Sequence, residues 1–227
     1  KYTNTSNYED KGMIEASVTT SAATTIQISK LDGAAYDNVL VQSDEPTSAE
    51  NGDMWIDTSS VPHTLKQYSA AADEWSAVAT SYVKISSLGI GNLFAEGDGV
   101  KISGITTATD LNTNTIIHSR GANYIVVTGI IDEVTSQETP ITVERKMPDM
   151  DFVIESGNRL WGCRYGESNG AMVNEIYSSK LGDFKNWECY AGISSDSWRA
   201  TVGSDGAFTG AVSFLGSPIF FKENCMH

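Results

Sequence analysis

Short apolar runs separated by turn residues are the main pattern of this chain. Within Gly52 to Val78, the segments Met54–Ile56, Leu65–Tyr68 and Trp75–Val78 have the length and composition of strands. The segments between them, DTSSVPH and SAAADE, are rich in residues that favour turns. The pattern predicts an all-β chain built of small β modules in series.

The N-terminal stretch differs from the rest in having few large apolar residues. The segment EASVTTSAATTIQISK contains β-branched residues without strong amphipathicity. We therefore expect residues 1–35 to form an extended arm with one or two strands. Such an arm usually gains its order from a neighbour.

Two modules are predicted to follow the arm. Residues 36–85 should form a small β module, with Trp55, Tyr68 and Trp75 supplying most of its core. The alternative role for these rings is a stacking surface for sugars. Residues 86–147 contain the strand-like run NTIIHSRGANYIVVTGIID and the alternating run TPITVERKMP. They predict a small β-barrel or sandwich.

Residues 148–227 contain hairpin-like repeats. Val153, Gly157, Leu160 and Trp161 match Val212, Gly216, Ile219 and Phe220 at a constant offset of 59 (212 − 153). Between the two hairpins, the segment NEIYSSKLGDFKNWECY offers strand-like runs at Glu175–Ser179 and Asn186–Tyr190. These features predict the start of a β-propeller-like domain, with a second repeat beginning near Trp198; the alternative is a β-sandwich.

A propeller needs about 4–8 blades to close its ring. We therefore expect the repeats within residues 148–227 to be incomplete. Either the native chain continues past residue 227, or these strands join a sheet made otherwise.

Charge and chemistry narrow the possible functions. The formal net charge of -14 argues against binding to nucleic acid or to an anionic membrane surface. Cys163 and Cys189 fall in strand-like runs near Trp residues and are expected to be packed thiols. The odd number of cysteines gives no disulfide framework. The acidic residues Asp149, Asp151 and Glu155 lie close together in the sequence, and Asp149 and Asp151 bracket a predicted boundary after Pro148.

No sequence motif indicates catalysis or a bound cofactor. The three histidines, His63, His118 and His227, are scattered, and no P-loop, GxSxG or HExxH occurs. We predict a non-enzymatic protein with no cofactor and no metal site.

The segments MPDMDFVIESGNRLWG, NEIYSSKLGDFKNW and VGSDGAFTGAVSFLGSPIFFKEN together resemble virion proteins of tailed bacteriophages, in particular those encoded in prophages of gut Firmicutes. The run GDMWIDT…LKQY…EWSAV is similar to a short module of tail and fibre proteins. The resemblance implies a nozzle- or hub-like component of the tail or of the head-to-tail junction. It also implies a virion location after assembly in the bacterial host cytoplasm, with homo-oligomers and other virion proteins as partners.

The resemblance carries no catalytic residues, and two other functions stay open. One is a receptor- or glycan-binding tail module that contacts a host surface glycan through Trp55, Trp75 or Trp198. The other is a tail-associated glycan hydrolase.

Overall fold

A computed structural model of the protein describes residues 14–168 and 170–227. Within these residues the chain is all-β, and its only helical element is the short 3-10 helix η1 (Thr109–Leu111). The chain forms two compact units. The central unit comprises Val18–Gly97 and Lys101–Val143, and the C-terminal unit comprises Asp98–Val100, Glu144–His227 and the described residues up to Ser17.

A five-stranded antiparallel sheet organises the central unit. In spatial order its strands are β10 (Ser119–Gly121), β11 (Tyr124–Thr128), β7 (Tyr82–Ser86), β2 (Thr24–Ser29) and β12 (Thr135–Gln137). The period of two in YVKIS directs Val83 and Ile85 to the same face, and both are fully buried. Ile26 of β2 and Ile125 of β11 flank Ile85 in register, which places three buried isoleucines side by side.

The chain also forms a separate four-stranded sheet. Its order is β1 (Ala16–Thr19), β13 (Thr142–Arg145), β8 (Gly99–Ser103) and β9 (Asn114–Ile116). Val100 and Ile102 of β8 and Val143 of β13 are buried, as their alternation with polar residues predicts.

The observed sheets do not follow the predicted domain boundaries at residues 35 and 85. Strand β2, expected in the arm, lies between β7 and β12 within the five-stranded sheet. Strand β7, which the predicted boundary at residue 85 divides, is the neighbour of β2. The aromatic module is therefore an insertion between two paired strands. Residues 1–13 of the predicted arm lie outside the described residues.

The inserted module is a four-stranded sheet in the order β3 (Val39–Gln42), β4 (Met54–Asp57), β5 (Thr64–Ser69) and β6 (Glu74–Ala77). Strands β4 to β6 confirm the three strands expected between Met54 and Val78, and β3 adds a parallel pairing to β4. Met54, Ile56 and Leu65 form its buried cluster.

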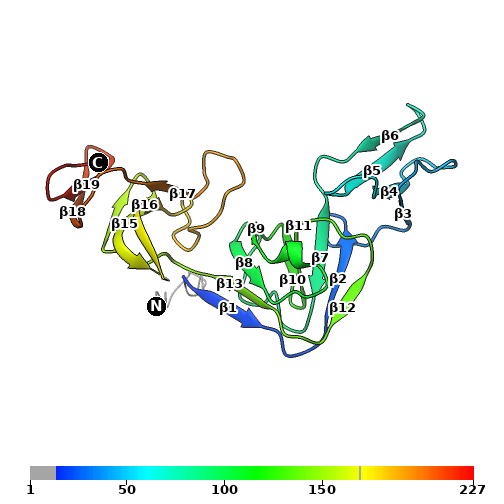
Figure 1. The fold of residues 1–227 in the computed structure, drawn as a ribbon, viewed down its shortest axis with the longest axis horizontal. Coiled ribbons are helices and arrows are strands. Elements are labelled where there is room, and N and C mark those ends of the chain that lie inside the picture. The colour runs from blue at the N-terminus through cyan, green and yellow to red at the C-terminus, as the bar shows by residue number, and fades with distance from the viewer. Residues whose placement is uncertain (1–13, 169) are drawn as a thin grey trace, which may run out of the picture. The chain divides into compact units, whose positions relative to one another are not determined.

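Two antiparallel arrays build the C-terminal unit, as Figure 1 shows. The first is a four-stranded meander, and the second is a two-stranded hairpin. Their strands are β14 (Phe152–Ser156), β15 (Arg159–Ser168), β16 (Ala171–Ser178) and β17 (Trp198–Thr201), followed by β18 (Phe208–Phe214) and β19 (Ser217–Lys222). Cys163, Ile176, Val202, Phe208 and Phe220 are buried together and join the meander to the hairpin. Over residues 14–168 and 170–227, the strands form neither a closed barrel nor a closed propeller.

Two expectations for this region are wrong. The run Asn186–Tyr190 is not a strand: it forms a loop whose Trp187 and Cys189 are buried, so its alternation reflects loop packing and not sheet pairing. Trp198 does not begin a new repeat, because β17 pairs with β16 and completes the meander.

Candidate functional site

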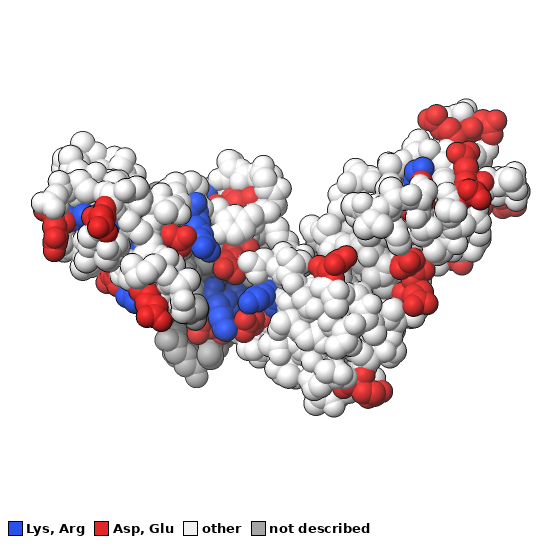
Figure 2. Space-filling model, in the orientation of Figure 1, with Lys and Arg blue, Asp and Glu red and all other residues white. Residues whose placement is uncertain are grey.

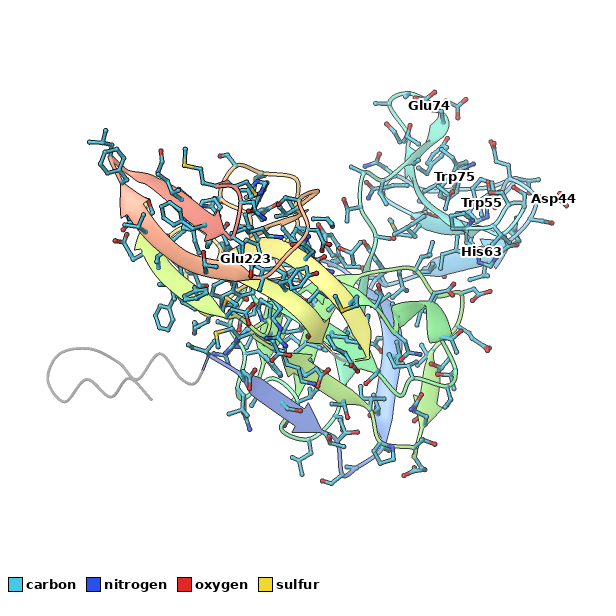
Figure 3. The ribbon with its side chains drawn as sticks, turned by 60° about the vertical axis from the view of Figure 1, so that its left-hand side comes forward. Asp44, Trp55, His63, Glu74, Trp75 and Glu223 are labelled. Carbon is cyan, nitrogen blue, oxygen red and sulfur yellow. The ribbon has the colours of Figure 1, made fainter. Side chains whose placement is uncertain are left out.

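The aromatic residues predicted as contact sites fall into two separate clusters. In the inserted module, the ring centroids of Trp55 and Trp75 lie 5.6 Å apart with a T-shaped geometry, and Tyr68 lies 5.4 Å from Trp75 (Figure 3). Trp55 is buried, and its indole N–H donates to the Gln42 carbonyl at 2.9 Å. Since Trp55 is only 2% exposed, its ring is not open to a ligand, whereas the half-buried Tyr68 and Trp75 retain accessible surface.

A lysine closes one side of this cluster. The Lys66 ammonium lies 4.5 Å from the Trp55 ring centroid and 2.8 Å from the Asp57 carboxylate. The hydrogen bond from Lys66, reinforced by those from Ser59, lowers the pKa of Asp57 to about 2. The charged pair thus holds the lysine over the indole and occupies the surface that a sugar ring would need.

Trp198 lies in a different environment, at the start of β17. Its side chain is 46% exposed, and its ring centroid is 5.8 Å from that of Trp161. The two indoles line a cavity of about 330 Å³, together with Pro218, Phe220 and His227. Of the three predicted contact residues, Trp198 is the one that the structure places at an open cavity.

The hairpin β18–β19 has one covered face and one uncovered face. Ala211 and Phe220 pack into the core of the C-terminal unit. On the opposite face, Val212 and Phe214 are 42% and 60% exposed, and Leu215 at the turn is 89% exposed. Ile219 and Phe221 share this uncovered face, because they alternate with the buried Phe220.

The outer backbone edge of β19 is closed. The Phe220 N–H donates to the His227 carbonyl at 2.7 Å, and the His227 N–H donates back at 2.8 Å. The Lys222 N–H donates to the Cys225 carbonyl at 2.8 Å. The C-terminal residues thus satisfy the edge of β19, and what the hairpin offers to a partner is an apolar face.

A buried polar cluster, which the sequence analysis missed, ties three distant segments of the C-terminal unit. Arg145 forms an ion pair with Asp98, and the two side chains are 3% and 2% exposed. The Asn186 amide donates to the Asp98 carboxylate and accepts from the Gly99 N–H, both at 2.9 Å. Gly99 is required here, because a Cβ at this position would lie 2.5 Å from the Glu188 carbonyl oxygen. These contacts indicate a structural role.

The remaining candidate side chains are engaged in local contacts. Asp151 accepts hydrogen bonds from the Arg164 guanidinium and from the Tyr165 N–H. Asp149 accepts from the Ser168 hydroxyl, and Glu155 accepts from the Asn158 N–H. These carboxylates stabilise turns and strand ends, and they do not converge on one cleft.

The thiols differ in burial. Cys163 and Cys189 are buried, and burial raises the pKa of the Cys163 thiol to about 12. Cys225 is exposed, and its sulfur lies 3.5 Å from the His227 ring, a contact that no sequence motif indicates. Among the described residues, no three His, Cys, Asp or Glu side chains are grouped so that they could hold a metal ion.

Surface charge and hydropathy add two observations. In Figure 2, acidic side chains are spread over the visible face, and Lys and Arg form only small groups. In the part of the chain that the structure describes, no helix has the length and apolar character needed to cross a membrane.

Comparisons with protein-family models, with curated proteins and with solved structures found no match. The function of the chain is therefore argued below from its own residues.

Proposed function

We propose that this chain is a non-enzymatic structural protein of a tailed-bacteriophage virion that acts by assembly. Its place is the tail or the head-to-tail junction, and its partners are copies of itself and other virion proteins. The observation that carries the proposal is the uncovered apolar face of β18–β19, formed by Val212, Phe214, Ile219 and Phe221, with Leu215 at the turn. Contiguous exposed apolar surface of this kind marks sites of association.

The form of the C-terminal unit supports the same proposal. In this proposal, the four-stranded antiparallel meander corresponds to one propeller blade, and the hairpin packed against it corresponds to the beginning of the next. The resemblance to phage tail proteins connects such repeats with nozzle- or hub-like parts of the particle. The inserted aromatic module has a mainly aliphatic core, contrary to the prediction that Trp55, Tyr68 and Trp75 supply most of it, and of these three rings Trp55 alone is buried.

Detection of the chain in particles tests this proposal. Particles purified from a host that carries the gene should contain the chain in several copies per virion, measured by quantitative mass spectrometry. Antibody-gold labelling in electron micrographs should mark the tail or its junction with the head. Particles that lack the chain, or labelling confined to material outside particles, would contradict the proposal.

A second function, recognition of a host surface glycan, is favoured by one observation. Trp161 and Trp198 line the same cavity of about 330 Å³, and Trp198 is half-exposed there. Aromatic rings beside an open cavity are suited to stacking on a sugar ring.

Glycan-array binding by the full chain tests this alternative. Trp198→Ala should abolish a glycan signal, whereas Trp75→Ala in the inserted module should leave it unchanged. A signal that survives Trp198→Ala, or no signal with the unmodified chain, would remove the alternative.

A further inference from the structure

The hairpins β14–β15 and β18–β19 are built on the same turn. In each, two residues connect the last cross-strand pair: Gly157 and Asn158 follow Ser156 in the first hairpin, and Leu215 and Gly216 follow Phe214 in the second. All four turn residues have positive φ, at 62°, 60°, 50° and 78° in chain order. Positive φ at both central residues is the property of a type I′ turn, which suits tight hairpins.

Superposing these turns corrects the predicted repeat. Ser156 corresponds to Phe214, so equivalent residues lie 58 positions apart (214 − 156), and not 59. The offset of 59 aligned Gly157 with Gly216, although these glycines occupy different positions of the turn. A change of one residue exchanges the two faces of a strand. The corrected register therefore decides which faces of the two hairpins are equivalent.

In the corrected register, the covered face of one hairpin corresponds to the uncovered face of the other. Ile154, Trp161 and Cys163 pack in the cluster that holds β18–β19 against the meander. Their equivalents in the second hairpin are the residues of its uncovered face, namely Val212, Ile219 and Phe221.

The opposite faces also correspond. Ala211 and Pro218 of the second hairpin lie on the face that is turned toward the meander, since they alternate with Val212 and Ile219. Their equivalents in the first hairpin are Val153 and Leu160, on the outer face of the meander. Val153 is half-exposed and Leu160 is partly exposed. Val153 and Leu160 are thus partly uncovered equivalents of Ala211 and Pro218, whereas Gly162, the equivalent of Phe220, is buried with Met150 packed against it.

We propose that these two surfaces bind each other between copies of the chain. The face of β18–β19 that carries Val212, Phe214, Ile219 and Phe221 in one copy packs on the outer face of β14–β15 that carries Val153 and Leu160 in a second copy. The inference rests on the proposed function in that it takes the chain to act by self-assembly. Because the two surfaces differ, the contact is head-to-tail, and it generates a ring or a filament.

The charge distribution favours this contact. From Phe208 to Phe221 the hairpin has no charged residue, although the whole chain has a net charge of -14. Burying this face therefore requires no desolvation of an ionised side chain on the hairpin. A face of this kind can be covered by apolar packing alone.

The receiving surface has a recess for the exposed turn. The side chains that line a cavity of about 520 Å³ beside the β14–β15 turn include Leu160, Phe184, Arg159 and Glu155. The Arg159 guanidinium already donates to the carbonyl oxygens of Ser179 and Ser194, at 2.7 and 2.8 Å. Covering this cavity with Phe214 or Leu215 of another copy would therefore leave no unpartnered cation, and Glu155 would keep its hydrogen bond from the Asn158 N–H, at 3.3 Å.

Cross-linking of the full chain tests the head-to-tail geometry. In a Cys225→Ser background, where the two remaining native thiols are buried, Val212→Cys and Val153→Cys variants are mixed and treated with a short bismaleimide. The mixture should give a covalent dimer, and each variant alone should not. A dimer formed by Val212→Cys alone would indicate a two-fold pairing of identical faces and would overturn the inference. As a matched control, the Val212→Cys variant is mixed with Val134→Cys in place of Val153→Cys. Val134 is an exposed residue of the central unit, and this mixture should give no dimer.

Light scattering provides the second measurement. The unmodified chain should have an average mass that exceeds the mass of one copy and rises with protein concentration. The Phe214→Asp variant should have the mass of the monomer and an unchanged melting temperature. Val134→Asp should leave the assembly intact. An unmodified chain that stays monomeric, or assembly that survives Phe214→Asp, would overturn the inference. Neither result bears on whether the chain is present in virions, which the particle measurements decide separately.

Discussion

The central unit and the C-terminal unit use similar apolar residues in opposite ways. In the central unit, Val83, Ile85 and Ile125 are completely buried between paired strands. In the C-terminal unit, Val212, Phe214 and Phe221 lie on one face of their hairpin with equal regularity, yet they are 42%, 60% and 39% exposed. The difference is not one of composition. It arises because a hairpin with two apolar faces needs a layer on each side, and the described chain supplies one layer.

In the C-terminal hairpin, the backbone edge of β19 and the apolar face differ in whether they are covered. The edge of β19 is paired with residues 225–227, so the backbone of the hairpin is not poised to add another strand there. Its side chains, in contrast, are uncovered. At β19 the C-terminal unit therefore presents an apolar face to a second layer, and not a free backbone edge to another strand.

The largest effect is expected for the buried ion pair of the C-terminal unit. Asp98→Ala leaves the Arg145 guanidinium buried without its carboxylate and should lower the free energy of unfolding by about 3–5 kcal/mol. Glu144→Ala, which removes the partner of the exposed Lys146, should cost no more than about 1 kcal/mol. Urea unfolding followed by tryptophan fluorescence measures both values, and equal losses for the two variants would refute the structural role of the cluster.

A second prediction addresses the comparison between the units directly. Ile85→Ala should cost about 2–5 kcal/mol, because it opens a cavity in a closed core. Phe214→Ala should change the stability of the monomer by no more than about 0.5 kcal/mol, although it removes a larger side chain. Calorimetry of dilute samples would show this contrast. A loss of several kcal/mol for Phe214→Ala would mean that the face is covered within a single copy.

The turn of β18–β19 provides a third, smaller effect. Leu215 adopts positive φ, a conformation that is unfavourable for a residue with a side chain. Leu215→Gly should therefore stabilise the unit by about 0.5–1 kcal/mol. Leu88→Gly is the matched control, since Leu88 is also exposed but does not have positive φ, and it should be neutral or destabilising. Thermal melts of both variants should differ in sign, and a destabilised Leu215→Gly would contradict the assigned turn.

The smallest effect concerns pH and the inserted module. The pKa of Asp57 is lowered from 3.8 to about 2 by its bonds with Lys66 and Ser59. A carboxyl whose pKa is lower in the folded state stabilises that state above its ordinary pKa and ceases to do so as the pH falls toward 2. Melting temperatures of the unmodified chain and of Asp57→Asn should thus differ above pH 4 and converge toward pH 2. A difference that is independent of pH would exclude this ionic contribution.

Local patterns of the sequence predict the strands well and their partners poorly. The three strands between Met54 and Val78 follow from alternation and turn residues, which act over a few positions. The pairing of β2 with β7 joins segments separated by the whole inserted module, and no local pattern encodes it. The Asp98–Arg145–Asn186 cluster could not be predicted for the same reason, because its residues are far apart in the sequence. The buried Trp187 and Cys189 alternate with more polar residues as in a strand, although they lie in a loop.

The insertion of β3–β6 has a consequence for how this protein can change. Ser29 at the end of β2 and Tyr82 at the start of β7 are direct cross-strand partners, so the chain leaves the five-stranded sheet and returns to it at neighbouring points. A segment joined in this way can be exchanged for another without altering the register of the sheet beneath it, provided that the apolar contacts of Ile28 and Ile130 with the module are replaced. The position between Ser29 and Tyr82 is thus a natural grafting site, at which different small domains can be carried on the same five-stranded sheet.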